Sequence, residues 1–183
     1  MTIPNLITLL RLLLVPAVIY AMLVGAMGWA LAGFILAGVS DAVDGFIARQ
    51  FDQRSELGAY LDPLADKLLL VSVFVVLGLM GELPLWLVLA AVSRDALIVI
   101  AVLVSTVMAM PVEVKPLPVS KANTAIQIVL AAFVLFELAF ATHFGGLRLW
   151  LVIATGLLTA ASAAAYLVTW IRHMSGYGEG ESA

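Results

Sequence analysis

The sequence predicts an all-α integral membrane protein, a bundle of six transmembrane helices with an active site that faces the cytoplasm. Composition is the first reason: 64% of the 183 residues are hydrophobic, 11% are charged, and the mean hydropathy is +1.15. A soluble domain carries about 25% charged residues. The second reason is the number of long apolar segments, and the third is the grouping of charge toward one face of the expected membrane.

Six apolar segments are separated by breaks rich in glycine and proline. Each has about 20 residues or more, which at about 1.5 Å per residue is enough to cross about 30 Å of hydrocarbon. The expected spans are 4–25, 28–50, 56–80, 84–109, 119–143 and 147–172. We expect one domain over 1–174, and a disordered C-terminal tail over 175–183, where glycine and polar residues dominate.

Positive charge predicts the orientation of the spans. The loops after the second and fourth segments are flanked by Arg49, Arg54, Lys67, Lys115 and Lys121, and Arg172 follows the last segment. The other side has little beyond Arg148 and Glu82. Because basic residues favour the cytoplasmic side, both termini are expected there.

Composition also excludes some classes of function. The net charge of −3 does not suit a nucleic-acid-binding protein. The chain has no cysteine, so disulfides, iron–sulfur clusters and thiol catalysis are excluded.

Four aspartates lie inside apolar segments, where each carboxylate costs about 2.5–3.5 kcal/mol to insert. Asp41 and Asp44 are three residues apart and share one helix face, and Asp62 and Asp66, four apart, share a face of the next helix. Four carboxylates that converge need cations, and oxygen ligands favour Mg²⁺, Mn²⁺ or Ca²⁺. Two divalent ions would cancel the charge, in an arrangement common in chemistry at phosphorus.

Small residues accompany these acids. Gly45, Ala48 and Gly58 leave room for close helix packing or for a bulky phosphate ligand. Arg49 is a suitable bidentate partner for that phosphate.

Two other interpretations compete with a metal site. Paired intramembrane charges could account for one or two acids, but four acids outnumber the nearby cations. A carboxylate-lined cation transporter needs a path open to both sides, and the opposite half of the bundle is apolar. Both are less favoured than the metal site.

The acidic run resembles the signature of the CDP-alcohol phosphatidyltransferases. It reads Asp41-x2-Asp44-Gly45-x2-Ala48-Arg49-x8-Gly58-x3-Asp62-x3-Asp66. Every fixed position of that pattern is matched, and the opening Pro4-Asn5-Leu-Ile-Thr8-Leu-Leu-Arg11 is similar to the N-terminal element of the family. The resemblance covers nearly the whole chain.

The resemblance implies transfer of a phosphatidyl group from CDP-diacylglycerol to an alcohol, with release of CMP. It assigns two Mg²⁺ or Mn²⁺ ions to Asp41, Asp44, Asp62 and Asp66, and the role of general base to Asp66. The positions that would bind the CDP-lipid are Asn5, Thr8, Gly45, Ala48, Arg49, Ser55 and Gly58. Ser55 is equally consistent with a helix N-cap. The resemblance also implies a homodimer in the bacterial inner membrane.

The acceptor alcohol is less well specified, with glycerol 3-phosphate, phosphatidylglycerol, serine and inositol phosphate as candidates. The segments Ser93-Arg94-Asp95 and 115–124 look like those of the CMP-forming cardiolipin synthases, which use phosphatidylglycerol. A phosphodiester carries one charge and needs fewer cations than the phosphomonoester of glycerol 3-phosphate. Arg94 and Lys121 are the expected acceptor-binding residues. Arg94 could instead form a structural ion pair with Asp95, and Lys121 could extend toward the membrane interface.

Overall fold

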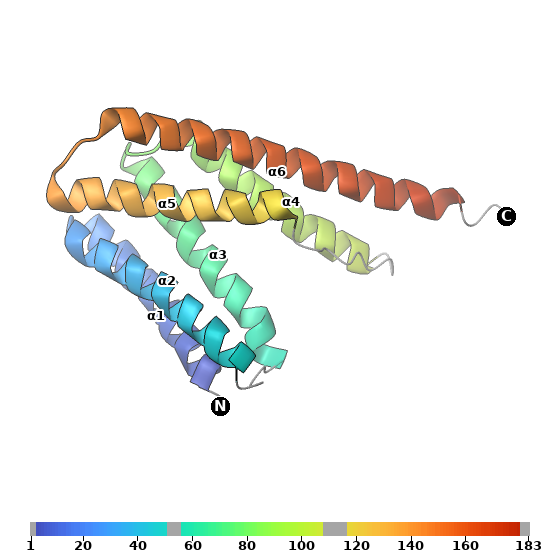
Figure 1. The fold of residues 1–183 in the computed structure, drawn as a ribbon, viewed down its shortest axis with the longest axis horizontal. Helices are drawn as coiled ribbons and strands as arrows, with labels where there is room; N and C mark the ends of the chain where they lie inside the picture. Colours follow the sequence, from blue (N-terminus) through green and yellow to red (C-terminus); the bar gives the residue numbers. More distant parts are fainter. Residues whose placement is uncertain (1–2, 51–55, 108–116, 180–183) are drawn as a thin grey trace.

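The computed structural model describes the backbone of residues 3–50, 56–107 and 117–179, and the side chains of 10–41, 67–100 and 117–171. Within these ranges the chain forms six helices and no strand, as Figure 1 shows. The helices are α1 (Ile3–Leu23), α2 (Met27–Gln50), α3 (Glu56–Leu79), α4 (Leu85–Val107), α5 (Pro118–Phe140) and α6 (Gly145–Glu179). The predicted all-α class is confirmed.

Each expected span corresponds to one helix whose ends lie within a few residues of it, apart from the C-terminal end of α6. That helix runs to Glu179 and includes residues 175–179, which we assigned to the tail, so the domain boundary stays a prediction. Two stretches of the described chain, Pro118–Phe140 and Gly145–Ile171, are long and apolar enough to cross a membrane. The count of six spans therefore also stays a prediction.

Two of the three described turns depend on glycine. Gly25 and Gly81 have φ angles of 77° and 78°, in the left-handed region that side chains disfavour. The residue after each glycine donates its backbone N–H to the end of the preceding helix, Ala26 to Ala21 at 2.8 Å and Glu82 to Leu77 at 2.9 Å. These bonds satisfy carbonyl groups that a helix end otherwise leaves unpaired.

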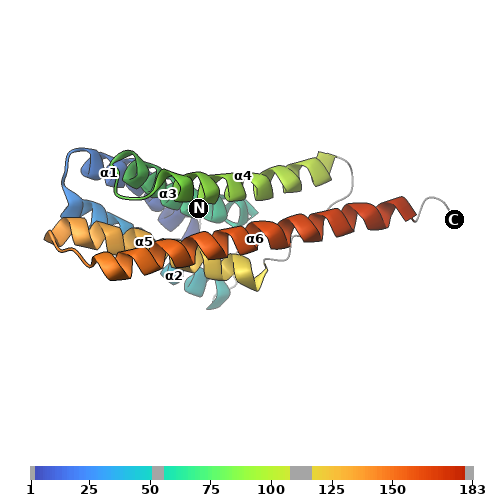
Figure 2. The same cartoon turned by 90° about the horizontal axis from the view of Figure 1, so that it is seen from above.

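The helices form two groups that meet mainly through α5, with a smaller contact between α3 and α4. α1 packs against α2 and α3, α6 packs against α4 and α5, and α5 also packs against α2. Figures 1 and 2 show α6 extending along α5 and beyond it. Among the described residues, α2 and α3 contact each other only slightly, although a short connection joins them.

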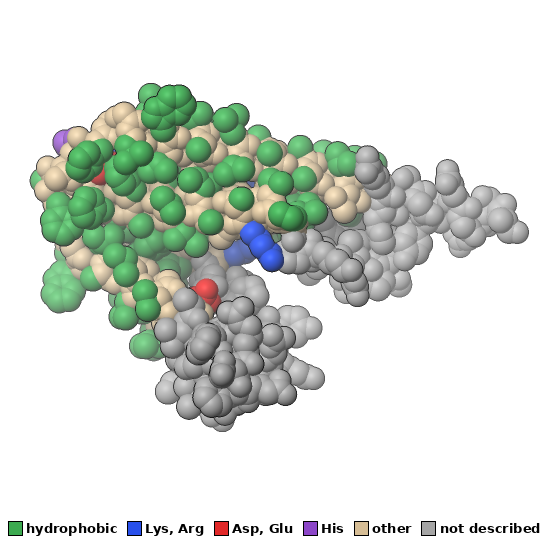
Figure 3. All heavy atoms as spheres, in the orientation of Figure 1, with side chains coloured by type: hydrophobic (Ala, Val, Ile, Leu, Met, Phe, Trp, Pro, Cys, Tyr) green, Lys and Arg blue, Asp and Glu red, His purple; other side chains and the backbone are tan. Residues whose placement is uncertain are grey.

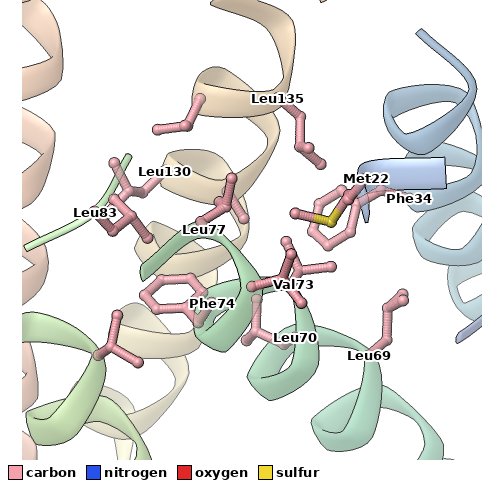
Figure 4. Close-up of a cluster of buried hydrophobic side chains, with 14 of the residues drawn as sticks. Met22, Phe34, Leu69, Leu70, Val73, Phe74, Leu77, Leu83, Leu130 and Leu135 are labelled. Atoms are coloured by element: carbon pink, nitrogen blue, oxygen red, sulfur yellow. The ribbon is translucent and has the colours of Figure 1, made fainter. Parts of the chain in front are cut away.

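The core lies where α1, α2, α3 and α5 meet. Figure 4 shows Met22 of α1 and Phe34 of α2 beside Val73 of α3, whereas Phe74 lies on the other side of α3, where Leu130 of α5 is also seen. All five side chains are buried.

Glycine permits close approach of helices at three places. A Cβ atom on Gly33 would lie 2.7 Å from Val18 Cγ2, one on Gly78 would lie 2.8 Å from Val88 Cγ2, and one on Gly156 would lie 2.8 Å from the ring of Trp86. Small residues at helix contacts are typical of membrane bundles, where van der Waals packing replaces the hydrophobic effect between helices.

Candidate functional site

A cavity of about 480 Å³ lies between α2, α3 and α5, and Asp95 of α4 reaches it. Its walls are mostly apolar, and its charged side chains are Asp41, Lys67 and Asp95. The lining residues are Phe34, Ile35, Ala37, Gly38, Val39, Asp41, Lys67, Leu69, Leu70, Asp95, Thr124, Ile128 and Ala132. Figure 3 shows basic and acidic side chains at the margins of a hollow on one face of the molecule.

Asp41 lies in α2, within the acidic run. Its side chain is 47% exposed, and its Oδ1 lies 3.1 Å from Nη1 of Arg11, which is 1% exposed in α1. The buried arginine requires a counter-ion in apolar surroundings, and Asp41 supplies one. The pair fixes one carboxylate oxygen of Asp41, so the carboxylate is oriented while its side chain stays accessible from the cavity.

Arg94 lies beside this cavity and is held by three helices. Its Nη1 donates to Asp95 at 2.6 Å, its Nη2 donates to Ser120 of α5 at 2.5 Å, and both its Nε and Nη2 donate to Ser162 of α6, at 3.1 and 2.6 Å. The guanidinium also lies 5.5 Å from the ring centroid of Tyr166, within the range of a cation–π contact. Only 3% of the side chain is exposed.

Lys67 of α3 joins the same group. Its Nζ lies 3.2 Å from Oδ1 of Asp95, the same oxygen that accepts from Arg94. Lys67 is 41% exposed, whereas Asp95 is 13% exposed. Asp95 therefore connects a buried cation and an accessible one at the wall of the cavity.

Lys121 lies outside this group. It is exposed at a second hollow lined by Ser120, Lys121, Thr124, Ala125 and Ile128. Thr124 and Ile128 line both hollows, so Lys121 is close to the main cavity without lining it.

The other end of the bundle carries a second charged group, formed by Glu82, Glu137 and Arg148. Arg148 Nη2 lies 2.7 Å from a carboxylate oxygen of Glu82, and Nη1 lies 3.5 Å from one of Glu137. Glu137 is buried, and its Oε1 accepts the backbone N–H of Phe144 at 2.6 Å. These contacts tie the α3–α4 turn to the α5–α6 turn.

The structure describes the side chains of only three expected site residues. Asp41 lines the cavity, Arg94 adjoins it through Asp95, and Lys121 lies at the neighbouring hollow. Asp44, Gly45, Ala48 and Arg49 lie in α2, Gly58, Asp62 and Asp66 in α3, and Asn5 and Thr8 in α1, with side chains outside the described residues. Ser55 lies outside them altogether.

Sequence reasoning missed three features of this site. Arg11 had no assigned partner, Lys67 was used only for orientation, and Asp95 was considered only as a structural partner of Arg94. A signal existed for the first, because an arginine inside an apolar segment requires an anion nearby.

Comparison with known proteins agrees with the resemblance in the sequence. The model of a family described as CDP-alcohol phosphatidyltransferase matches residues 1–171. A Mycobacterium tuberculosis protein named putative cardiolipin synthase is 48% identical over 99 residues, which are 54% of this chain and 47% of that protein.

Two proteins named cardiolipin synthase (CMP-forming) are also similar. The human one is 37% identical over 147 residues, 72% of this chain and 49% of that protein. The Streptomyces coelicolor one is 41% identical over 108 residues, 56% of this chain and 50% of that protein. The chain thus spans about half the length of these relatives.

Proposed function

Because the chain belongs to the CDP-alcohol phosphatidyltransferase family, we propose that it transfers a phosphatidyl group from CDP-diacylglycerol to phosphatidylglycerol. The products are cardiolipin and CMP. The names of its curated relatives support this acceptor, since they are cardiolipin synthases.

One observation carries the proposal. A single cavity combines apolar walls from α2, α3 and α5 with charged groups from Asp41, Lys67 and Asp95. A phospholipid has the same two parts, because its acyl chains need apolar contacts and its phosphate needs a cation. Arg94 is one hydrogen bond away, through Asp95.

The four carboxylates of the acidic run are suited by their chemistry to a divalent metal site, and the structure describes the side chain of one of them, Asp41. Asp41 presents an oxygen donor at the cavity, and helical spacing places Asp44 on the same face of α2. Asp62 and Asp66 share one face of α3 in the same way. The expected ligands are therefore all carboxylates, which suit two Mg²⁺ or Mn²⁺ ions. Bound ions would supply charge neutralisation at the diphosphate and at the departing CMP.

The reaction needs one proton transfer from the acceptor. The hydroxyl oxygen of phosphatidylglycerol forms a bond to the phosphatidyl phosphorus as the bond from that phosphorus to CMP breaks, and Asp66 takes the hydroxyl proton. Asn5, Thr8, Gly45, Ala48, Arg49, Ser55 and Gly58 are proposed to bind the CDP-lipid. Arg94, and Lys121 from the neighbouring hollow, are proposed to bind the phosphate of the acceptor.

The proposed setting is the inner membrane of a bacterium, with six spans, both termini in the cytoplasm and the cavity on the same side. Support comes from the basic residues that flank the second and fourth loops. The division into a domain over 1–174 and a tail over 175–183, and the homodimer, are part of the same proposal.

An assay of the purified chain in liposomes tests this function. CDP-diacylglycerol and Mg²⁺ or Mn²⁺ are supplied with phosphatidylglycerol, glycerol 3-phosphate, serine or inositol phosphate in turn, and CMP and the lipid product are measured. We expect CMP and cardiolipin with phosphatidylglycerol. Formation of phosphatidylglycerophosphate from glycerol 3-phosphate would show that glycerol 3-phosphate is the acceptor, in place of phosphatidylglycerol. Metal-driven ion flux without release of CMP would favour a cation transporter.

A further inference from the structure

The carboxylate of Asp95 contacts two cations through one oxygen. Its Oδ1 lies 2.6 Å from Nη1 of Arg94 and 3.2 Å from Nζ of Lys67. Both Asp95 and Lys67 line the cavity. The group of Arg94, Lys67 and Asp95, which we call the acceptor triad, therefore has two basic side chains and one acidic one, a formal net charge of +1.

We propose that Asp95 restricts the acceptor to a phosphate with a single negative charge, by cancelling one of the two cations that it joins. This inference rests on the proposed function and names the property by which that site selects its alcohol. The phosphate of phosphatidylglycerol is a phosphodiester with one negative charge. The phosphate of glycerol 3-phosphate is a monoester that reaches two at neutral pH, as phosphomonoesters do.

Charge selection is effective in such a place because a confined cavity screens charges less than water does. The second negative charge of a phosphomonoester would lie near the carboxylate of Asp95 without a cation to neutralise it, so the phosphomonoester would bind less well. Among the side chains that the structure describes, the other charges near the cavity are Asp41, which is paired with Arg11, and Lys121, which is exposed to solvent at the neighbouring hollow.

A purely structural role for Asp95 leaves Lys67 unexplained. Arg94 is already held by Ser120 and Ser162, and Asp95 supplies its remaining anionic partner. Lys67 is 41% exposed at the cavity, and a structural partner for Arg94 has no need of it. An accessible lysine beside an acid is instead suited to contact a ligand that enters the cavity.

Asp95→Asn is the decisive variant, since asparagine keeps an oxygen that accepts from Arg94 and removes only the charge. With CDP-diacylglycerol saturating, kcat/KM is measured for phosphatidylglycerol and for glycerol 3-phosphate. We expect their ratio to shift about tenfold or more toward glycerol 3-phosphate. At mildly alkaline pH, where inorganic phosphate is mostly a dianion, it should also inhibit cardiolipin formation at lower concentration in the variant.

A second variant separates charge from shape. Lys67→Met combined with Asp95→Asn restores the net charge of +1, so the acceptor ratio should return toward that of the wild type. Glu82→Gln is the matched control, because it removes a carboxylate at the other end of the bundle and should leave the ratio unchanged.

Several outcomes would overturn the inference. One is an equal loss for both acceptors in Asp95→Asn, and another is a wild-type preference for glycerol 3-phosphate. If Asp95→Asn does not fold, Lys67→Met alone tests the inference. This variant should raise KM for phosphatidylglycerol and weaken inhibition by phosphate, without changing KM for CDP-diacylglycerol. An unchanged KM for phosphatidylglycerol and unchanged inhibition by phosphate would overturn the inference. Absence of CMP from the wild type with every acceptor would instead remove the proposed function, and the inference with it.

Discussion

The two ends of the bundle use the same kinds of charged residue in opposite ways. At one end, which we call the turn end, Arg148 lies between Glu82 and the buried Glu137, and the backbone N–H of Phe144 completes the group. At the other, the cavity end, Asp41 is paired with Arg11 and Lys67 with Asp95, yet the side chains of Asp41 and Lys67 both remain more than two-fifths exposed.

The difference lies in what each ion pair leaves accessible. At the turn end the pairs connect two turns, and the buried member, Glu137, is an acid within an apolar helix. At the cavity end the buried members are cations, Arg11 and Arg94, and the accessible groups face a cavity. Buried arginines whose acidic partners line a cavity leave a site ready for a ligand, whereas a buried acid held by the backbone stabilises the fold.

The largest expected effect belongs to the cavity end. Asp66→Asn removes both a proposed metal ligand and the proposed base, so turnover should fall by about 10³-fold or more, since a general base alone contributes about 10²–10⁴-fold. Binding of CDP-diacylglycerol, measured by calorimetry in detergent, should persist because the other carboxylates remain. Near-normal turnover would refute the assignment of Asp66 as base.

Arg94→Ala should come next. It removes a guanidinium that contacts Asp95, Ser120 and Ser162 and that we propose binds the acceptor phosphate. Loss of a hydrogen bond to a charged group should raise KM for the acceptor about tenfold to a hundredfold. KM for CDP-diacylglycerol should change much less. Equal increases in both would identify Arg94 as a structural residue and weaken the contrast between the two ends.

At the turn end we expect a loss of stability and not of chemistry. Arg148→Met leaves the buried carboxylate of Glu137 without its cation, which should cost about 2–3 kcal/mol. A fully buried pair would cost about 3–5 kcal/mol, but Arg148 is partly exposed and the N–H of Phe144 remains. Thermal unfolding in detergent measures the change, and kcat at low temperature should match the wild type. Glu82→Gln, a partly exposed partner, should cost about 1 kcal/mol or less.

The smallest expected effect is on stability and tests the packing of α1 against α2, in the part of the bundle that lies between the two charged ends. Gly33→Ala places a methyl group 2.7 Å from Val18, so overpacking should cost about 1–3 kcal/mol. Gly28→Ala, on the same helix with nothing within 4 Å, should instead be neutral or stabilise by up to about 1 kcal/mol. The difference between the two unfolding temperatures is the measurement, and equal shifts would show that α1 and α2 are not held in close contact at Gly33.

The helices could be predicted from the sequence because their signals are local. Apolar segments of about 20 residues, and turn glycines such as Gly25 and Gly81, specify where helices run and end without reference to distant residues. The acidic run also predicts an oxygen-rich site from spacing alone. Of its four aspartates the structure describes the side chain of Asp41, which lines a cavity, so the site itself stays a prediction.

The pairings could not be predicted, because they depend on which helices meet. Arg11 and Asp41 are brought together by the packing of α1 on α2, and Lys67 meets Asp95 across α3 and α4. Glu137 was overlooked at the turn end, although an acid inside an apolar segment is itself a signal. The described contacts of Arg94 match its expected structural pairing with Asp95 and leave its role toward the acceptor as a prediction.

The ion pair of Arg11 and Asp41 has a consequence for biosynthesis. Arg11 lies near the middle of α1, and in the proposed six-span arrangement an arginine there without Asp41 would cost about 2.5–3.5 kcal/mol on entry into the bilayer. When α1 leaves the ribosome, Asp41 has not yet followed. The two helices are therefore expected to enter the membrane together as a hairpin, so translation through α2 would precede stable insertion of the first helix.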